Sequence, residues 1–138
     1  MMKEIASLII LLALCIPSLA TDMPDMIGNW TGTFNAVSWV KNTDERASGK
    51  VNYWDDPYTI AIEEQNGTRL AGRMIPTKNP LHTEILLGLI GSDNGSINLV
   101  SGNLIIWGLI KSPTEMELFE QLVDIDYMGV GRGVFTKE

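Results

Sequence analysis

The stretch Ile27-Gly28-Asn29-Trp30-Thr31-Gly32-Thr33-Phe34-Asn35-Ala36 decides the fold, because its residues alternate in type. Small or apolar residues occupy every second position from Gly28 to Ala36, and asparagine or threonine occupies the positions between. Successive side chains of a strand point to opposite faces. This period of two therefore predicts a strand with one buried and one solvated face.

Further strand candidates follow at short intervals. Residues 42–50 are predicted as a loop, and residues 51–54 as a short strand that ends at Asp55-Asp56-Pro57. The next candidates, separated by turn residues, are 58–64, 68–74, 83–91, 96–101, 104–111, 115–122 and 127–136. The strands number eight, or nine with 51–54, and form an all-β meander.

Such a meander favours an eight-stranded antiparallel up-and-down β-barrel, because closure removes the unpaired edges of an open sheet. A two-sheet sandwich is the alternative architecture. It normally requires longer crossing connections than the short turns between these segments.

The hairpin formed by 58–64 and 68–74 has two possible registers. A two-residue Asn66-Gly67 turn would place Glu63 opposite Leu70 and mix the two faces. A three-residue loop of residues 65–67 instead places Ile62 opposite Leu70, and Glu63 opposite Arg69 in solvent. We predict the second register.

The first twenty residues predict export. Lys3 precedes an apolar run over residues 5–19, and Ser18-Leu19-Ala20 supplies the small residues of a cleavage site. The run is shorter than the roughly 18 to 20 residues of a membrane-spanning helix, which favours cleavage over retention as an anchor. We therefore predict a signal peptide over 1–20, a single barrel domain over 21–138, and a secreted or extracytoplasmic location. Cys15, the only cysteine, is removed with the signal, so packing and not disulfides must stabilise the domain.

The formal net charge of −7 argues against nucleic acid as a partner. The acidic residues are scattered along the chain rather than gathered in a tract. They are typical of a soluble extracellular protein.

Glycines alternate in the last strand, at Gly129, Gly131 and Gly133. One face of this strand therefore has no side chains, and we expect it to accept a core aromatic such as Trp30 or Trp107. The alternative is a ligand cavity that needs the space.

Two strands, within 85–90 and 104–110, are apolar on both faces. A strand with water on one side should alternate. Either a loop or a second copy of the chain is expected to cover them, so homo-oligomerisation is a candidate property.

Aromatic residues supply the candidate ligand contacts. The mouth of a barrel lined by aromatic rings is a common place to hold a small molecule. Trp30 is expected in the core, whereas Trp39 and Trp54 flank the polar segment where a lid would sit. The predicted ligand-binding residues are Trp39, Trp54, Tyr58 and Trp107.

No pattern in the sequence predicts a catalytic or metal site, and we expect neither a cofactor nor an enzyme. His82, the only histidine, falls in a predicted loop, where a solvated role is expected. Asp93, Asp124 and Asp126 do not reproduce a calcium loop. Asn66 and Asn94 lie in glycosylation sequons at predicted hairpin tips, whereas the sequon at Asn29 lies inside a strand and is the poorest of the three.

Two segments carry a family resemblance. Residues 27–33, with Gly28-Asn29-Trp30, and residues 131–137 resemble the first and last strands of avidin-like and lipocalin-like barrels. The middle of the chain resembles small exported archaeal proteins of unknown function. Avidins carry an asparagine two residues after the tryptophan and a late aspartate, whereas this chain has Gly32 and, near the second position, Arg132. The resemblance thus implies a calycin-type barrel and not biotin binding.

The leading functional hypothesis is an exported, non-enzymatic barrel that binds a small apolar or amphipathic ligand. The alternative is an extracellular structural or protein-interaction module, with a filled barrel and no ligand. A cavity inside the barrel distinguishes the two.

Overall fold

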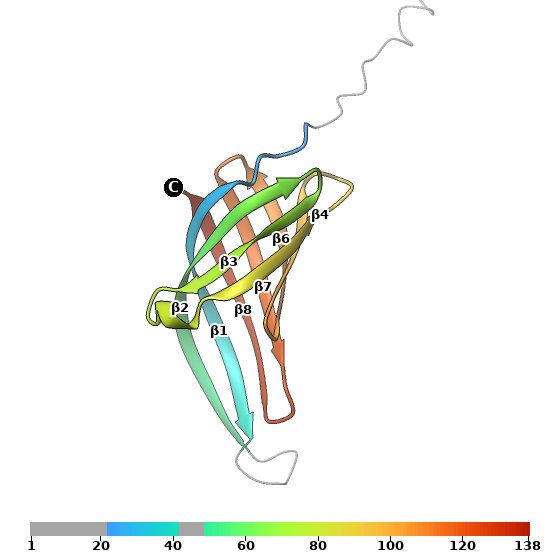
Figure 1. Ribbon diagram of the computed structural model, residues 1–138. Coiled ribbons are helices and arrows are strands. Elements are labelled where there is room, and N and C mark those ends of the chain that lie inside the picture. The colour runs from blue at the N-terminus through green and yellow to red at the C-terminus, as the bar shows by residue number, and fades with distance from the viewer. Residues whose placement is uncertain (1–21, 42–48) are drawn as a thin grey trace, which may run out of the picture.

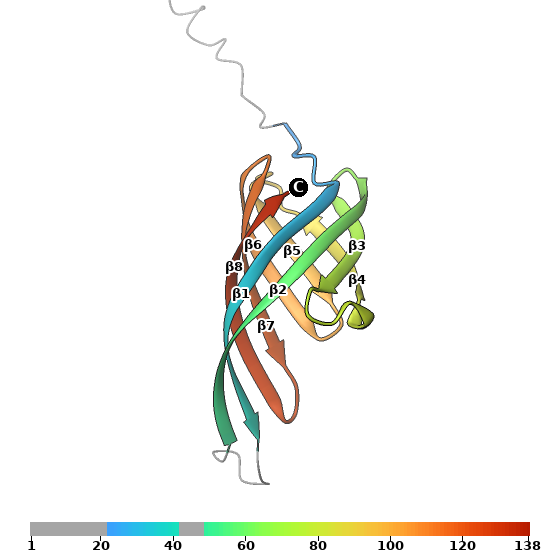
Figure 2. The same ribbon diagram turned by 90° about the vertical axis from the view of Figure 1, so that its left-hand side faces the viewer.

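The computed structural model describes residues 22–41 and 49–138, which form one closed antiparallel barrel (Figures 1 and 2). Each strand pairs with the next, and β8 closes on β1. The predicted up-and-down barrel is therefore confirmed, and the sandwich is wrong. The strands are β1 (Gly28–Lys41), β2 (Gly49–Asn66), β3 (Arg69–Pro76), β4 (Glu84–Ile90), β5 (Ser96–Ser101), β6 (Leu104–Ser112), β7 (Glu115–Val123) and β8 (Tyr127–Lys137).

The predicted signal peptide, 1–20, and most of the predicted loop 42–50 lie outside the described residues. A 3₁₀ turn, η1 (Pro80–His82), connects β3 to β4. In the two described stretches, no helix is long and apolar enough to cross a membrane.

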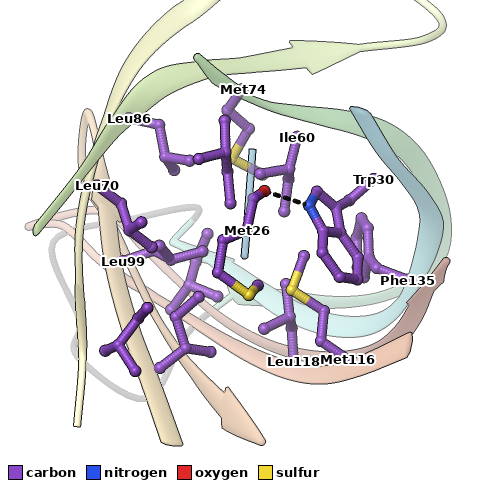
Figure 3. Close-up of a cluster of buried hydrophobic side chains, with 14 of the residues drawn as sticks. Met26, Trp30, Ile60, Leu70, Met74, Leu86, Leu99, Met116, Leu118 and Phe135 are labelled. Carbon is purple, nitrogen blue, oxygen red and sulfur yellow. Dashed lines mark hydrogen bonds between the residues drawn. The ribbon is translucent and has the colours of Figure 1, made fainter. Parts of the chain in front are cut away.

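The core follows from the period of two in the strands. In β1, Trp30 and Phe34 point inward and are fully buried, as the alternation predicts. Phe34 packs against Phe135 of β8 with ring centroids 4.9 Å apart. Inward aliphatic and methionine side chains from the other strands complete the core (Figure 3).

One end of the barrel is closed by the segment that precedes β1. Met26 is 1% exposed and lies among the core side chains, and its carbonyl accepts a hydrogen bond from Trp30 Nε1 at 2.9 Å (Figure 3). The Gln65 amide accepts from Met26 N and donates to the Pro24 carbonyl. These bonds satisfy buried polar groups while a methionine fills the end of the core.

The predicted register of the β2–β3 hairpin is wrong by two residues. Ile62 lies opposite Gly72, and Gln65 lies opposite Leu70. Asn66 pairs with Arg69 across a two-residue turn in which Gly67 has a φ of +60°, and a bulge at position 63 inserts an extra residue into β2. The bulge lets Gln65 point inward and hold the N-terminal segment.

The faces of this hairpin were nevertheless predicted correctly, because a shift of two residues preserves which side chains point inward. Ile60, Ile62, Leu70 and Met74 are all buried. Glu63 is exposed, but its ion pair is with Arg73 and not with Arg69.

The predicted break at Asp55-Asp56-Pro57 is also wrong, because β2 continues through it. The Pro57 carbonyl accepts a hydrogen bond from Thr77 N at 2.9 Å. In a strand, the nitrogen and carbonyl of one residue face the same neighbour. The missing N–H therefore falls just beyond the end of β3, and pairing with β1 loses no donor.

The glycines of β8 face inward, as predicted, but no tryptophan covers them. The Phe135 ring lies over Gly133, and the Glu120 side chain lies over Gly131. Trp30 sits elsewhere in the core, and Trp107 points outward with 41% of its surface exposed.

The outer faces of β4, β5 and β6 are apolar in the described structure. Their exposed residues are Ile85, Leu87, Leu89, Val100, Ile105, Trp107 and Leu109. We call this set the outer apolar face.

Candidate ligand-binding site

The strands differ in length, and this leaves one end of the barrel open. β1 and β2 pair as far as Lys41 and Gly49, whereas β3 joins β2 only from Tyr58 onward. β1, β2, β7 and β8 consequently extend past η1 and form a wall on one side of the opening (Figure 2). We call this opening, opposite the end closed by Met26, the mouth.

The mouth contains a cavity of about 470 Å³. This volume is within the range of small-molecule sites. Its wall combines apolar and aromatic side chains with a small number of charged ones. The lining residues are Trp54, Asp56, Tyr58, Met74, Pro76, Lys78, Asn79, His82, Glu84, Asn103, Leu104, Glu120, Leu122 and Tyr127.

Two aromatic side chains in the mouth are held by neighbours on β1. Trp54 Nε1 donates to the Oγ of the buried Ser38 at 3.0 Å. The Tyr58 ring packs edge-on against Phe34, with centroids 6.0 Å apart. Both rings are half-buried and line the cavity.

The Tyr58 hydroxyl stays protonated over the whole neutral range. Burial, followed by the negative charge of Asp56 and a hydrogen bond to Asp56, raises the pKa of Tyr58 far above its usual value. The hydroxyl is therefore a hydrogen-bond donor directed at the Asp56 carboxylate.

Glu120 is the most unusual residue of the cavity. It points inward from β7 and is only 3% exposed. No hydrogen bond or ion pair holds its carboxyl group within residues 22–41 and 49–138. Burial, followed by the negative charge of Asp56, raises the pKa of the Glu120 carboxyl to about 7.

Acidic groups outnumber basic ones around the cavity. Asp56, Glu84 and Glu120 line it, against Lys78 and the exposed His82 of η1. Lys78 Nζ is 3.9 Å from the Asp56 carboxylate and donates to a backbone carbonyl of β2. These two contacts hold its charge beside Asp56.

The structure brings together two of the four predicted ligand-contact residues. Trp54 and Tyr58 line the mouth. Trp39 lies on the outside of β1 against Gly49, and Trp107 stacks on Phe119 on the outside of β6 and β7. The alternation of inward and outward positions along a strand could have placed Trp39 on the outside, because it is an odd number of residues from the inward Trp30 and Phe34. The same rule could not have placed Trp107, because β6 is apolar on both faces.

Sequence reasoning did not single out Glu120. An acidic residue in a strand ordinarily marks the solvated face, and β7 contains three glutamates. The signal that could have found it is the alternation along the strand. Glu120 is an even number of residues from Met116 and Leu118, both of which are fully buried, so its side chain should point inward as theirs do.

A second, more open hollow of about 610 Å³ lies across the outer surface near Trp107, Phe119 and Arg132. Its lining also includes Ala36 and Gly131. Trp54 and Glu120 line this hollow as well as the mouth. We favour the mouth as the site, because it is the more enclosed of the two.

The sequons have different exposures. Asn66 is exposed at the end of β2, and Asn94 is half-buried between β4 and β5 with a φ of 53°. Glycosylation at either position stays a prediction. The described residues contain no group of three side chains that could hold a metal ion.

No protein-family model and no curated protein matches the chain. A solved structure, that of EF1p2_mFAP2b bound to DFHBI, is similar with a TM-score of 0.46 and 11% sequence identity. The match covers 84% of this chain and 94% of that one. At these values the similarity implies nothing about a ligand here.

Proposed function

We propose that this chain is an exported, non-enzymatic protein that binds a small apolar or amphipathic molecule in the mouth of its barrel. The cavity of about 470 Å³ is the observation that supports this function. Met26 fills the opposite end, so the barrel is packed in one half and hollow in the other. A barrel that served only as a rigid support would be expected to fill both halves.

The lining of the mouth suits an amphipathic ligand. Apolar surface is supplied by Met74, Leu104 and Leu122. Flat aromatic surface is supplied by Trp54 and Tyr58, whose rings are held in place by contacts with β1. A few charged groups stand among them, an arrangement that fixes the orientation of a bound molecule.

Binding of a neutral dye, N-phenyl-1-naphthylamine, tests this function, because its fluorescence rises when it enters an apolar site. Leu122→Trp should fill the mouth and remove most of the signal. Val123→Trp is the matched control, because the neighbouring Val123 is 63% exposed on the outside. The proposal fails if the wild type does not bind the dye, or if both variants bind it as the wild type does.

A second candidate function is an interaction module that associates through the outer apolar face. The exposed residues of β4 and β6, among them Ile85 at 74% and Ile105 at 56%, favour it. We propose a second copy of this chain as the partner. Native mass spectrometry tests this association, and a strictly monomeric protein would contradict it.

A further inference from the structure

The chemistry of the mouth narrows the class of ligand, and Glu120 is the starting point. A buried carboxyl group normally has a hydrogen-bond partner, because its desolvation is otherwise costly. As a residue Glu120 is 97% buried, and its carboxyl group, which has no partner in the described part of the chain, opens onto the cavity. Water can occupy that place in the free protein, but a ligand that displaces the water must bring its own donor.

The charges around Glu120 decide what kind of donor fits. Asp56 of β2 and Glu84 of β4 share the cavity with it, and Tyr58 already directs its hydroxyl toward Asp56. Lys78 lies close to Asp56 and is largely exposed, and His82 is exposed in η1. The interior of the mouth therefore has a negative potential, which attracts a cation and repels an anion.

The aromatic side chains of the mouth also favour a cationic ligand. Trp54 and Tyr58 line the cavity that Glu120 shares. A cation close to the face of such a ring is attracted by its quadrupole, and more strongly where water is excluded. The same rings and Leu122 can pack against an apolar body.

We propose that the ligand of the mouth is a small organic cation, with an ammonium or amidinium group that donates to Glu120 and an apolar body against Trp54 and Tyr58. This inference rests on the proposed function, because it requires that the mouth bind a ligand. It adds the charge of that ligand and the residue that recognises it.

Three molecules of the same size, 1-naphthylmethylammonium, 1-naphthylmethanol and 1-naphthoate, test the inference by calorimetry at about pH 8, where Glu120 is largely ionised. The cation should bind about tenfold or more tightly than the alcohol, because a hydrogen bond between charged groups contributes at least that factor. Naphthoate should bind least. Glu120→Gln should remove the preference for the cation and leave the affinity for the alcohol nearly unchanged.

Glu117→Gln is the matched control. It makes the same substitution on the same strand, but Glu117 lies on the outside in an ion pair with Lys111. It should leave all three affinities as they are. Thermal unfolding confirms that both variants are folded.

The outcomes separate this inference from the function on which it rests. If the alcohol binds as well as the cation, or if Glu120→Gln keeps the preference, the cationic ligand is wrong while the binding function stands. If none of the three binds a protein that binds the neutral dye, the cationic ligand is again wrong. If the dye also fails to bind, the proposed function itself is wrong.

Discussion

Glu120 on β7 lies directly opposite Gly131 on β8, and its Oε1 is 2.5 Å from the position that a Cβ on Gly131 would occupy. The Ala36 side chain on β1 approaches the same position to 3.1 Å. The absent side chain of Gly131 thus makes room for the buried carboxyl group. A glycine and an acidic residue on neighbouring strands together shape one wall of the mouth.

Gly131→Val should therefore lower stability by about 1 to 3 kcal/mol, the usual cost of overpacking. Urea unfolding measures the change. In a Glu120→Ala background the same substitution should cost less, because the space is then free, and the difference gives the coupling between the two residues. An unchanged or raised stability for Gly131→Val would contradict the inward contact.

Glu120 also predicts how stability depends on pH. Its pKa is raised from 4.5 to about 7 in the folded protein, so the folded state holds its proton more tightly than the unfolded chain does. The contribution of Glu120 to the stability of the fold should be greatest below about pH 4.5 and should be lost as the pH rises through 7. The other charged or titratable groups that face the same cavity are Asp56, Glu84, Tyr58, Lys78 and His82.

Glu120→Gln should remove that part of the pH dependence and stabilise the protein at pH 8 by about 1 to 3 kcal/mol. Urea unfolding of both proteins between about pH 4 and pH 8 tests the prediction. Parallel curves for the two proteins would show that Glu120 titrates normally in the fold.

The local pattern of the sequence predicted the barrel. It did not predict features of a strand that depend on contacts with another, distant segment of the chain. Alternation located most of the strands and, where the pattern was clear, their faces, including the inward face of β8. The register of β2 and β3 depends on a bulge at position 63, and that bulge is coupled to the bonds between Gln65 and the segment before β1. Likewise, Pro57 is tolerated only because β3 ends beside it. Neighbouring residues in the sequence carry no signal for either feature.

The candidate site was predictable in part for the same reason. Trp54 and Tyr58 were predicted as ligand contacts because they are aromatic, and the structure places both in the mouth. Whether Trp107 points in or out cannot be read from a strand that is apolar on both faces. Glu120 becomes notable only once its burial and the surrounding charges are known.

The two tryptophans that flank residues 42–50 should differ in their effect on ligand binding. Trp54→Leu removes a ring from the mouth and should weaken binding of the neutral dye several-fold or more. Trp39→Leu is the matched control, because Trp39 lies on the outside of β1, and it should leave dye binding unchanged. Fluorescence titration measures both. Equal losses in the two variants would place the dye outside the mouth.

Met26 should contribute much more to stability than its place before the first strand suggests. Met26→Ala removes a fully buried side chain from the closed end of the core and should cost about 2 to 5 kcal/mol. Met23→Ala is the control, because Met23 is 42% exposed, and it should change stability little. Urea unfolding that shows equal effects for the two variants would contradict the closure of the barrel by Met26.

The outer apolar face predicts association that one added charge should abolish. Ile105 is 56% exposed on β6 and lies opposite Val100, another member of that face. Burial of a lysine there would cost several kcal/mol, so Ile105→Lys should shift a dimer to monomers in analytical ultracentrifugation. Val134→Lys is the control, because Val134 is similarly exposed, at 49%, but lies on β8 outside this face. It should leave the dimer intact, and a wild type that sediments as a monomer at every concentration would show that the face is not covered by a second copy.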